Sequence, residues 1–137
     1  MNNNSVVLRL VFGKVSFLFT GDAQADAESS MLISSVSPVK ATILKVGHHG
    51  SRTASSPAFL SVVQPEVAVY SAGAGNSYGH PHPETMAALL AVGATIYGTD
   101  VNGPVVVTTD GITYKVEAAK GQPRAPPAVN APSTGSR

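Results

Sequence analysis

Short apolar runs alternate with turn-forming residues along this chain, and this pattern predicts a succession of strands and helices. The runs 5–12 and 15–20 are rich in Val, Leu and Phe, and Gly13-Lys14 lies between them. A turn of this kind between two apolar runs predicts a β-hairpin at the start of the chain. Further strands are predicted at 41–46, 67–71, 94–97, 104–109 and 112–116. We expect Asp110-Gly111 to form the turn between the last two strands.

Helices are expected between the strands. Residues 23–36 contain Ala, Glu, Met and Leu, which favour a helix, and Pro38 would end it. Pro57 suits the first position of a short helix that reaches about Val63. Pro83 opens another helix, which ends at a Val-Gly pair. The predicted order of elements is ββαβαβαβββ, and the predicted fold class is a layered α/β fold.

The length and composition indicate one globular domain. A chain of 137 residues with 43% hydrophobic residues can bury one ordinary core. Residues 119–137 are mostly Pro, Ala, Ser and Gly, so we expect a disordered tail after a domain that spans 1–118. No apolar run approaches the roughly 18 residues that span a bilayer, and no targeting signal begins the chain. We therefore expect the chain as given to be soluble.

The net charge and the lack of cysteine limit how the chain could bind nucleic acid or a metal ion. Nine Lys and Arg against eight Asp and Glu give a net charge of +1, which excludes general electrostatic binding of nucleic acid by the whole surface. Any site for a polyanion must therefore be local. The chain has no cysteine, so a metal site would have to use histidine and carboxylate ligands.

The four histidines of the chain lie in two loops that follow buried strands. His48 and His49 come after one predicted strand, and His80 and His82 come after the next. Asp22 follows a strand in the same way. Open α/β sheets collect ligands at the carboxyl ends of their strands. We therefore expect Asp22, His48 and His80 to lie at one edge of one sheet.

Carboxylate and imidazole groups without thiolate suit Zn²⁺ or Mn²⁺. Such an ion lowers the pKa of a bound water to near 7 and so supplies hydroxide for hydrolysis. Each loop also has a simpler interpretation. Asp22 could belong to a plain turn or cap a helix, the His-His-Gly segment could be a surface turn, and His80 and His82 alternate with prolines as in a rigid exposed turn.

Four segments together resemble the metallo-β-lactamase-like domain of the ComEC family. They are Phe-Leu-Phe-Thr-Gly-Asp at 17–22, Ile-Leu-Lys-Val-Gly-His-His-Gly-Ser at 43–51, Asn-Ser-Tyr-Gly-His-Pro at 76–81 and Tyr-Gly-Thr-Asp at 97–100. Each segment is moderately specific alone, whereas their order and spacing are strongly specific. The resemblance covers about residues 2–117 and implies half of an αββα sandwich.

The resemblance also implies roles for individual residues. Asp22 would be the carboxylate that bridges two divalent metal ions, Zn²⁺ or Mn²⁺, and His48 would bind the second ion. His49 would contact the phosphate or act in catalysis together with His80. Asn76 and Ser51 would lie on the substrate side. Which of His48 and His49 binds the metal is left open.

One half of the expected domain is absent from this chain. The family's His-x-His-x-Asp-His motif, which supplies most metal ligands, does not occur in it, and residues 2–4 are Asn where other members place a histidine. A single half also leaves an apolar sheet face uncovered. We therefore expect a truncated or split half that needs an N-terminal companion half, and that is marginally stable or self-associating when alone.

Three hypotheses for function follow. The first is a metal-dependent phosphodiesterase, specifically a nuclease that acts on DNA during competence, incomplete in this chain and attached to an inner-membrane channel in the parent protein. The second is a freestanding hydrolase of a small phosphoester or ester. The third is a non-catalytic remnant or interaction module with at most weak affinity for metals.

Overall fold

A computed structural model of the chain describes residues 4–34 and 38–125. Its strands are β1 (Leu8–Phe12), β2 (Val15–Phe19), β3 (Ile43–Lys45), β4 (Val67–Tyr70), β5 (Thr95–Gly98), β6 (Val105–Thr109) and β7 (Tyr114–Ala118). Its helices are α1 (Ala25–Ile33), η2 (Gly47–Gly50), α2 (Pro57–Val63), α3 (Pro83–Ala91) and α4 (Thr99–Asn102). Within the described part of the chain, no helix is long and apolar enough to cross a membrane.

The strands form a five-stranded sheet in the order β1-β2-β3-β4-β5 and a separate two-stranded sheet of β6 and β7. A tight turn makes β1 and β2 antiparallel, whereas helical crossovers make β2, β3, β4 and β5 run parallel. The predicted layered α/β fold is confirmed. The sequence pattern did not predict the short helices η2 and α4.

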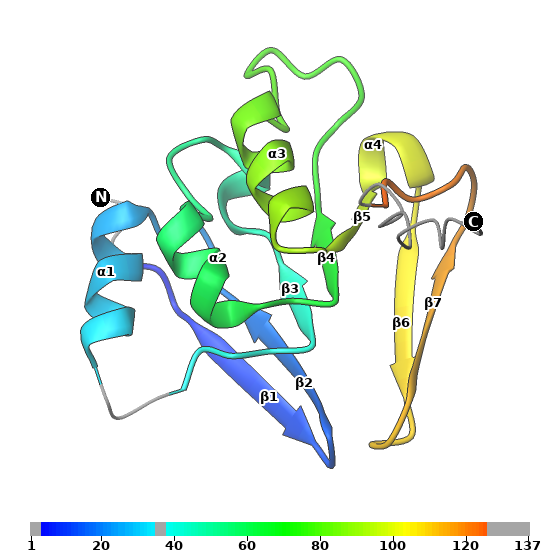
Figure 1. The fold of residues 1–137 in the computed structure, drawn as a ribbon. Helices are drawn as coiled ribbons and strands as arrows, with labels where there is room; N and C mark the ends of the chain where they lie inside the picture. Colours follow the sequence, from blue (N-terminus) through cyan, green and yellow to red (C-terminus); the bar gives the residue numbers. More distant parts are fainter. Residues whose placement is uncertain (1–3, 35–37, 126–137) are drawn as a thin grey trace, which may run out of the picture.

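One face of the five-stranded sheet packs against α1, α2 and α3 and forms the core (Figure 1). Successive residues of a strand point to opposite faces, so every second strand residue is buried here. The strand residues in this core are Leu18, Leu44, Ala68, Tyr70 and Ile96, and Val46 follows directly after β3. Helices α2 and α3 contribute Phe59, Leu60, Val63, Met86 and Leu89.

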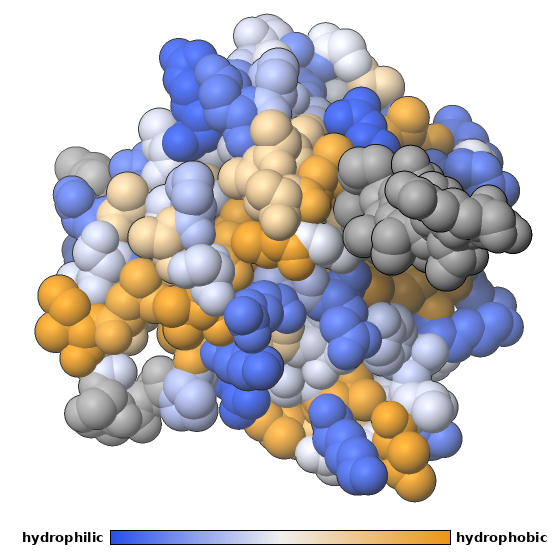
Figure 2. Space-filling model, viewed as in Figure 1, coloured by the Kyte–Doolittle hydropathy of each residue, from blue (hydrophilic) through white to orange (hydrophobic). Residues whose placement is uncertain are grey.

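The opposite face of the sheet, called here the open face, is only partly covered by the β6–β7 hairpin. Lys14 N–H donates to the Gly111 carbonyl (2.6 Å), which joins the β1–β2 turn to the tip of this hairpin. On β1, Leu8, Leu10 and Phe12 stay more than half exposed. Apolar side chains gather where these two turns meet, at the lower end of Figure 2. Ile43 and Val67 on this face are buried, so the open face is exposed mainly along β1.

The predicted starts of the first and last strands are wrong. The last strand begins at Tyr114 and not at residue 112, because Asp110 Oδ1 accepts hydrogen bonds from the N–H groups of Ile112 (2.8 Å) and Thr113 (2.7 Å). The turn therefore spans 110–113 instead of Asp110-Gly111 alone. The first strand begins at Leu8 and not at residue 5.

The described chain continues beyond the predicted domain boundary at residue 118. Asn102, which is buried, donates from Nδ2 to the carbonyls of Lys120 (3.1 Å) and Gln122 (3.3 Å). Arg124 pairs with Ile96 at the β5 edge of the sheet. Residues 126–137 of the predicted tail and residues 35–36 of the first predicted helix lie outside the described residues.

Gly98 gives a direct test of the core packing. An added Cβ there would lie 1.9 Å from Cζ of the buried Tyr70 ring, whereas one on Gly73 would have nothing within 4 Å. We expect Gly98→Ala to lower the free energy of unfolding by about 2 kcal/mol or more, as overpacking does. Gly73→Ala should change it by less than about 0.5 kcal/mol. Urea unfolding measures both, and equal effects would contradict the packing described here.

Candidate functional site

The carboxyl ends of β2, β3 and β4 bring the candidate residues to one edge of the sheet. These strands are parallel neighbours, so the turn after β2, helix η2 after β3 and the loop after β4 leave the sheet side by side. His48 N–H donates to the Gly21 carbonyl (3.0 Å), which joins the first two segments. The imidazoles of His48 and His80 have centroids 5.8 Å apart, which brings the third segment to the same place.

The turn that carries Asp22 is held in place from two sides. Asp22 N–H donates to Ser5 Oγ (3.1 Å). On the other side, a Cβ on Gly47 would lie 2.9 Å from Thr20 Oγ1, so glycine is needed for η2 to approach this turn. Burial lowers the pKa of the Lys45 ammonium, and the Asp22 carboxylate partly opposes that effect. Asp22 therefore places a half-buried carboxylate beside a cation at the end of β2 and β3.

Helix η2 holds two histidines in an unusual backbone conformation. His48 (φ 46°) and His49 (φ 57°) both adopt the left-handed region, which costs free energy for residues with a Cβ. His48 Nδ1 lies 3.3 Å from Thr53 Oγ1. His49 Nδ1 donates to the Ser71 carbonyl (2.9 Å), which leaves its Nε2 free to accept a hydrogen bond or proton.

Glu28 anchors the loop that follows these histidines. Its carboxylate is buried, at 1% exposed, and accepts hydrogen bonds from the N–H groups of Ser55 and Ser56. Ser56 in turn caps α2 by accepting from Phe59 N–H. The sequence analysis did not single out Glu28, because one glutamate in a helix ordinarily faces solvent. Its partners lie 27 and 28 residues away, and no local pattern identified them.

The loop after β4 docks on η2 through His82 and Pro81. His82 N–H donates to the Gly50 carbonyl (2.9 Å), and His82 Nδ1 accepts from Arg52 N–H (3.1 Å). A Cβ on Gly50 would lie 2.8 Å from Pro81 Cβ, so the two loops are in close contact. This contact brings the four imidazoles into one cluster.

His80 occupies the centre of this histidine cluster. Its ring centroid lies 4.9 Å from that of His82, 5.8 Å from that of His48 and 6.1 Å from that of His49. Tyr78 stacks on His80 at 5.7 Å. Burial lowers the pKa of the His80 imidazole, and the neighbouring histidines lower it further. His80 therefore favours the neutral form, which can accept a proton.

The two residues predicted to contact substrate are engaged in their own loops. Asn76 Nδ2 donates to the carbonyls of Gly73 (2.9 Å) and His80 (2.6 Å), and its Oδ1 accepts from Tyr78 N–H (3.2 Å) and His80 N–H (3.0 Å). Ser51 is buried, and its hydroxyl lies 3.0 Å from Thr53 Oγ1. Both therefore shape the site, and their contact with substrate stays a prediction.

The edge supplies a carboxylate, several imidazoles and an ammonium, but no complete metal cage. Among residues 4–34 and 38–125, no group of three or more His, Cys, Asp and Glu side chains is arranged to hold a metal ion. The types of donor suit Zn²⁺ or Mn²⁺, whereas their number does not. The arrangement can bind and orient an anion or contribute part of a metal site.

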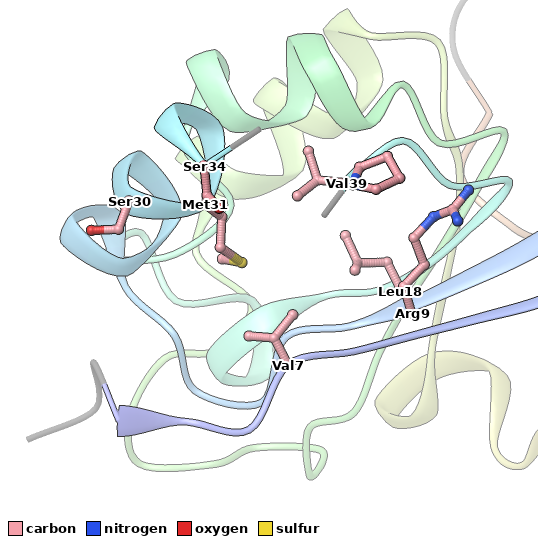
Figure 3. A pocket seen from close by; sticks show the side chains of 8 residues that line it. Val7, Arg9, Leu18, Ser30, Met31, Ser34 and Val39 are labelled. Atoms are coloured by element: carbon pink, nitrogen blue, oxygen red, sulfur yellow. The ribbon is translucent and has the colours of Figure 1, made fainter. Parts of the chain in front are cut away.

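A pocket elsewhere in the molecule lacks this chemistry. It has a volume of about 460 Å³ and lies between α1 and the first two strands (Figure 3). Side chains that line it include Val7, Arg9, Leu18, Met31 and Val39. Arg9 is the one ionisable side chain among its lining residues, so the loop edge is the better candidate for a catalytic site.

Curated relatives match most of the chain. It is 38% identical over 105 residues to ComE operon protein 3 of Bacillus subtilis, which covers 76% of this chain and 13% of that protein. It is 39% identical over 102 residues to Competence protein ComA of Neisseria gonorrhoeae, covering 74% and 15%. It is 40% identical over 106 residues to Recombination protein 2 of Haemophilus influenzae, covering 77% and 13%.

The chain thus spans 13 to 15% of the length of these relatives. No family model matches it, and no solved structure matches it significantly.

Glu28 should be required for the order of the 51–56 loop. Glu28→Ala leaves two buried N–H groups without an acceptor, and we expect it to lower the free energy of unfolding by about 2 kcal/mol. Faster amide hydrogen exchange is expected at Ser55 and Ser56. Glu117→Ala, at an exposed ion pair, is the control and should cost less than about 1 kcal/mol. Unchanged exchange at both serines would contradict the anchoring role.

Asn76 should hold His80 in place through its side-chain oxygen. Asn76→Ala removes the acceptor for the N–H groups of Tyr78 and His80, so their amide exchange should become faster. Asn76→Asp keeps an acceptor oxygen and should preserve part of that protection, although it loses the donor to the carbonyls of Gly73 and His80. If the Ala variant kept the full protection of both amides in the unsubstituted protein, measured by NMR, the loop would not depend on Asn76.

Proposed function

We propose that this chain, which is similar to a segment of the ComEC family of competence proteins, is half of a metal-dependent phosphodiesterase domain acting in DNA uptake. The observation that supports the proposal is the convergence of Asp22 with the histidine cluster at one sheet edge. The full activity would need a companion half that supplies the remaining metal ligands. In the parent protein this domain would be attached to a membrane channel.

Asp22 and His48 are the proposed metal ligands of this half. They lie on adjacent segments joined by the hydrogen bond from His48 N–H to the Gly21 carbonyl. A divalent ion bound there would supply a Lewis acid and an activated water. The described residues alone do not complete its coordination, so the companion half would provide the other ligands.

His49 and His80 are the proposed phosphate-facing and proton-transferring groups. The Ser71 carbonyl orients the His49 ring and leaves Nε2 available to donate to a phosphate oxygen or to take a proton, depending on its charge state. The lowered pKa of the His80 imidazole favours a neutral ring that can accept a proton. The net charge of +1 suits a site that binds one phosphate better than one that follows a long strand.

The open face is the proposed docking surface of the companion half. A groove of about 310 Å³ runs between this face and β6, and it is lined mainly by Phe17, Phe19, Ile43, Lys45, Val69, Ser71, Thr99, Val105 and Val107. Lys45 lines this groove, and the charge of the nearby Asp22 carboxylate acts to raise the pKa of the Lys45 ammonium. A second sheet packed over the open face would therefore bury the apolar groove and bring its own ligands to the site edge.

Two other functions remain as proposals. Within residues 4–34 and 38–125 the set of metal donors is incomplete, which supports a non-catalytic interaction module when the chain is alone. A freestanding hydrolase of a small phosphoester or ester would use the same edge, but it would need ligands from a second copy or another protein.

Metal binding by the chain alone tests the proposed half-site. We expect calorimetry to show weak binding of Mn²⁺ or Zn²⁺, and the double substitution Asp22→Ala, His48→Ala to weaken it by about tenfold or more, since two of its few ligands are lost. Glu117→Ala removes an exposed carboxylate on β7, outside the proposed site, and should change the affinity by less than about threefold. Equal binding by the chain and the double variant would refute the half-site.

A further inference from the structure

The two edges of the five-stranded sheet differ. The β5 edge is covered by the chain itself, because Ile96 N–H donates to the Arg124 carbonyl (2.7 Å) and Arg124 N–H donates to the Ile96 carbonyl (2.9 Å). At the other end of the sheet, β1 pairs with β2, and no described residue pairs with its outer side. One edge is therefore closed and the other is open.

On the outer side of β1, the backbone groups of Arg9 and Val11 have no partner among the described residues. Val11 lies opposite Ser16, but Ser16 N–H donates to Thr42 Oγ1 (3.1 Å) on the β3 side. Val11 and Ser16 therefore form a non-hydrogen-bonded pair, and the N–H and C=O of Val11 point away from β2. Because this orientation alternates along a strand, those of Arg9 point the same way.

β1 has few of the features that usually protect an edge strand. Natural sheets protect edge strands with charged side chains, proline, bulges or a covering segment. The sequence of β1 is Leu-Arg-Leu-Val-Phe, regularly paired over its five residues. Its one charge, Arg9, donates from Nε to the Lys40 carbonyl (2.8 Å), on the face that carries the helices. The edge is thus available for pairing.

We propose that β1 is a dimerisation edge, which pairs antiparallel with β1 of a second copy of this chain about a two-fold axis at Leu10. In this register Leu10 faces Leu10 of the other copy, and Leu8 faces Phe12, so that exposed apolar side chains meet. Arg9 faces Val11, and these two residues exchange the backbone hydrogen bonds that are free in the single chain. The strand is therefore self-complementary in both side chains and backbone.

Charge selects this register over its neighbours. An axis at Arg9 would place two like charges opposite each other, which destabilises a strand pair. An axis at Val11 would place Leu8 opposite Lys14. The axis at Leu10 avoids both arrangements and pairs apolar residues on the open face. It is a closed, isologous contact, the commonest kind in homodimers.

This dimer is compatible with the proposed companion half but does not rest on it. A two-fold axis between antiparallel strands is perpendicular to the sheet, so the open faces of both copies lie on the same side. The pairing joins the two sheets edge to edge and leaves the groove beside β6 accessible. A partner that covers the open face could therefore bind each copy of the dimer.

Single cysteines test the register, because the chain has no cysteine of its own. Leu10→Cys places two thiols on opposite residues of a non-hydrogen-bonded pair, with Cα atoms about 4.5 Å apart, within reach of a disulfide. Leu8→Cys should not cross-link to itself, because its copies lie about 13 Å apart along the strands. A mixture of Leu8→Cys and Phe12→Cys should cross-link. Val106→Cys, equally exposed on β6, is the control.

The expected result is a disulfide dimer with Leu10→Cys and with the mixed pair only. Cross-linking of Leu8→Cys or Val106→Cys as readily as Leu10→Cys would overturn the proposal in favour of non-specific association. A monomer in light scattering at the concentrations used for cross-linking would also overturn it.

A backbone variant separates edge pairing from stacking of the open faces. Val11→Pro removes an N–H that β2 does not use, a change that edge strands tolerate. We expect it to abolish the dimer in light scattering while β2 and the core stay folded by circular dichroism. A dimer that survives Val11→Pro but is lost with Phe19→Lys, on the open face, would assign the association to that face and refute the β1 edge.

Discussion

The parallel pairing of β2 with β3 and of β3 with β4 is the constraint on which the rest of the structure depends. It aligns the carboxyl ends of three strands, so that Asp22, the η2 histidines and the loop carrying His80 leave the sheet at one edge. The same pairing requires helical crossovers, and these helices bury Leu18 and Leu44 on one face. The same parallel strand pairing therefore produces both the site and the core.

The loops at this edge include backbone conformations that cost free energy locally. Contacts with residues distant in the sequence stabilise these loops. Left-handed backbone at His48 and His49 is unfavourable by itself. The buried Glu28 carboxylate fixes the segment that follows, and the contact between Pro81 and Gly50 fixes the loop that faces it. Such rigid loops present imidazoles in fixed positions, as a site that binds phosphate or metal requires.

The two faces of the five-stranded sheet are covered to different extents. The helices bury one face, whereas the open face keeps exposed apolar side chains and a groove beside the β6–β7 hairpin. This asymmetry agrees with relatives that are much longer than this chain. The proposed companion half and the proposed second copy would use separate surfaces, the open face and the β1 edge.

The sequence by itself determined the order of strands and crossover helices, because apolar runs, prolines and tight turns are local signals. It also predicted that Asp22, His48 and His80 share an edge, since parallel strands end together. It did not reveal that Glu28 is buried or that the amide of Asn76 is fully hydrogen-bonded. The start of the last strand was also missed, because Asp110 organises a longer turn than its sequence indicates. Only the tertiary structure decided these features, because loop folding and long-range packing, and not the local sequence pattern, set which hydrogen bonds form.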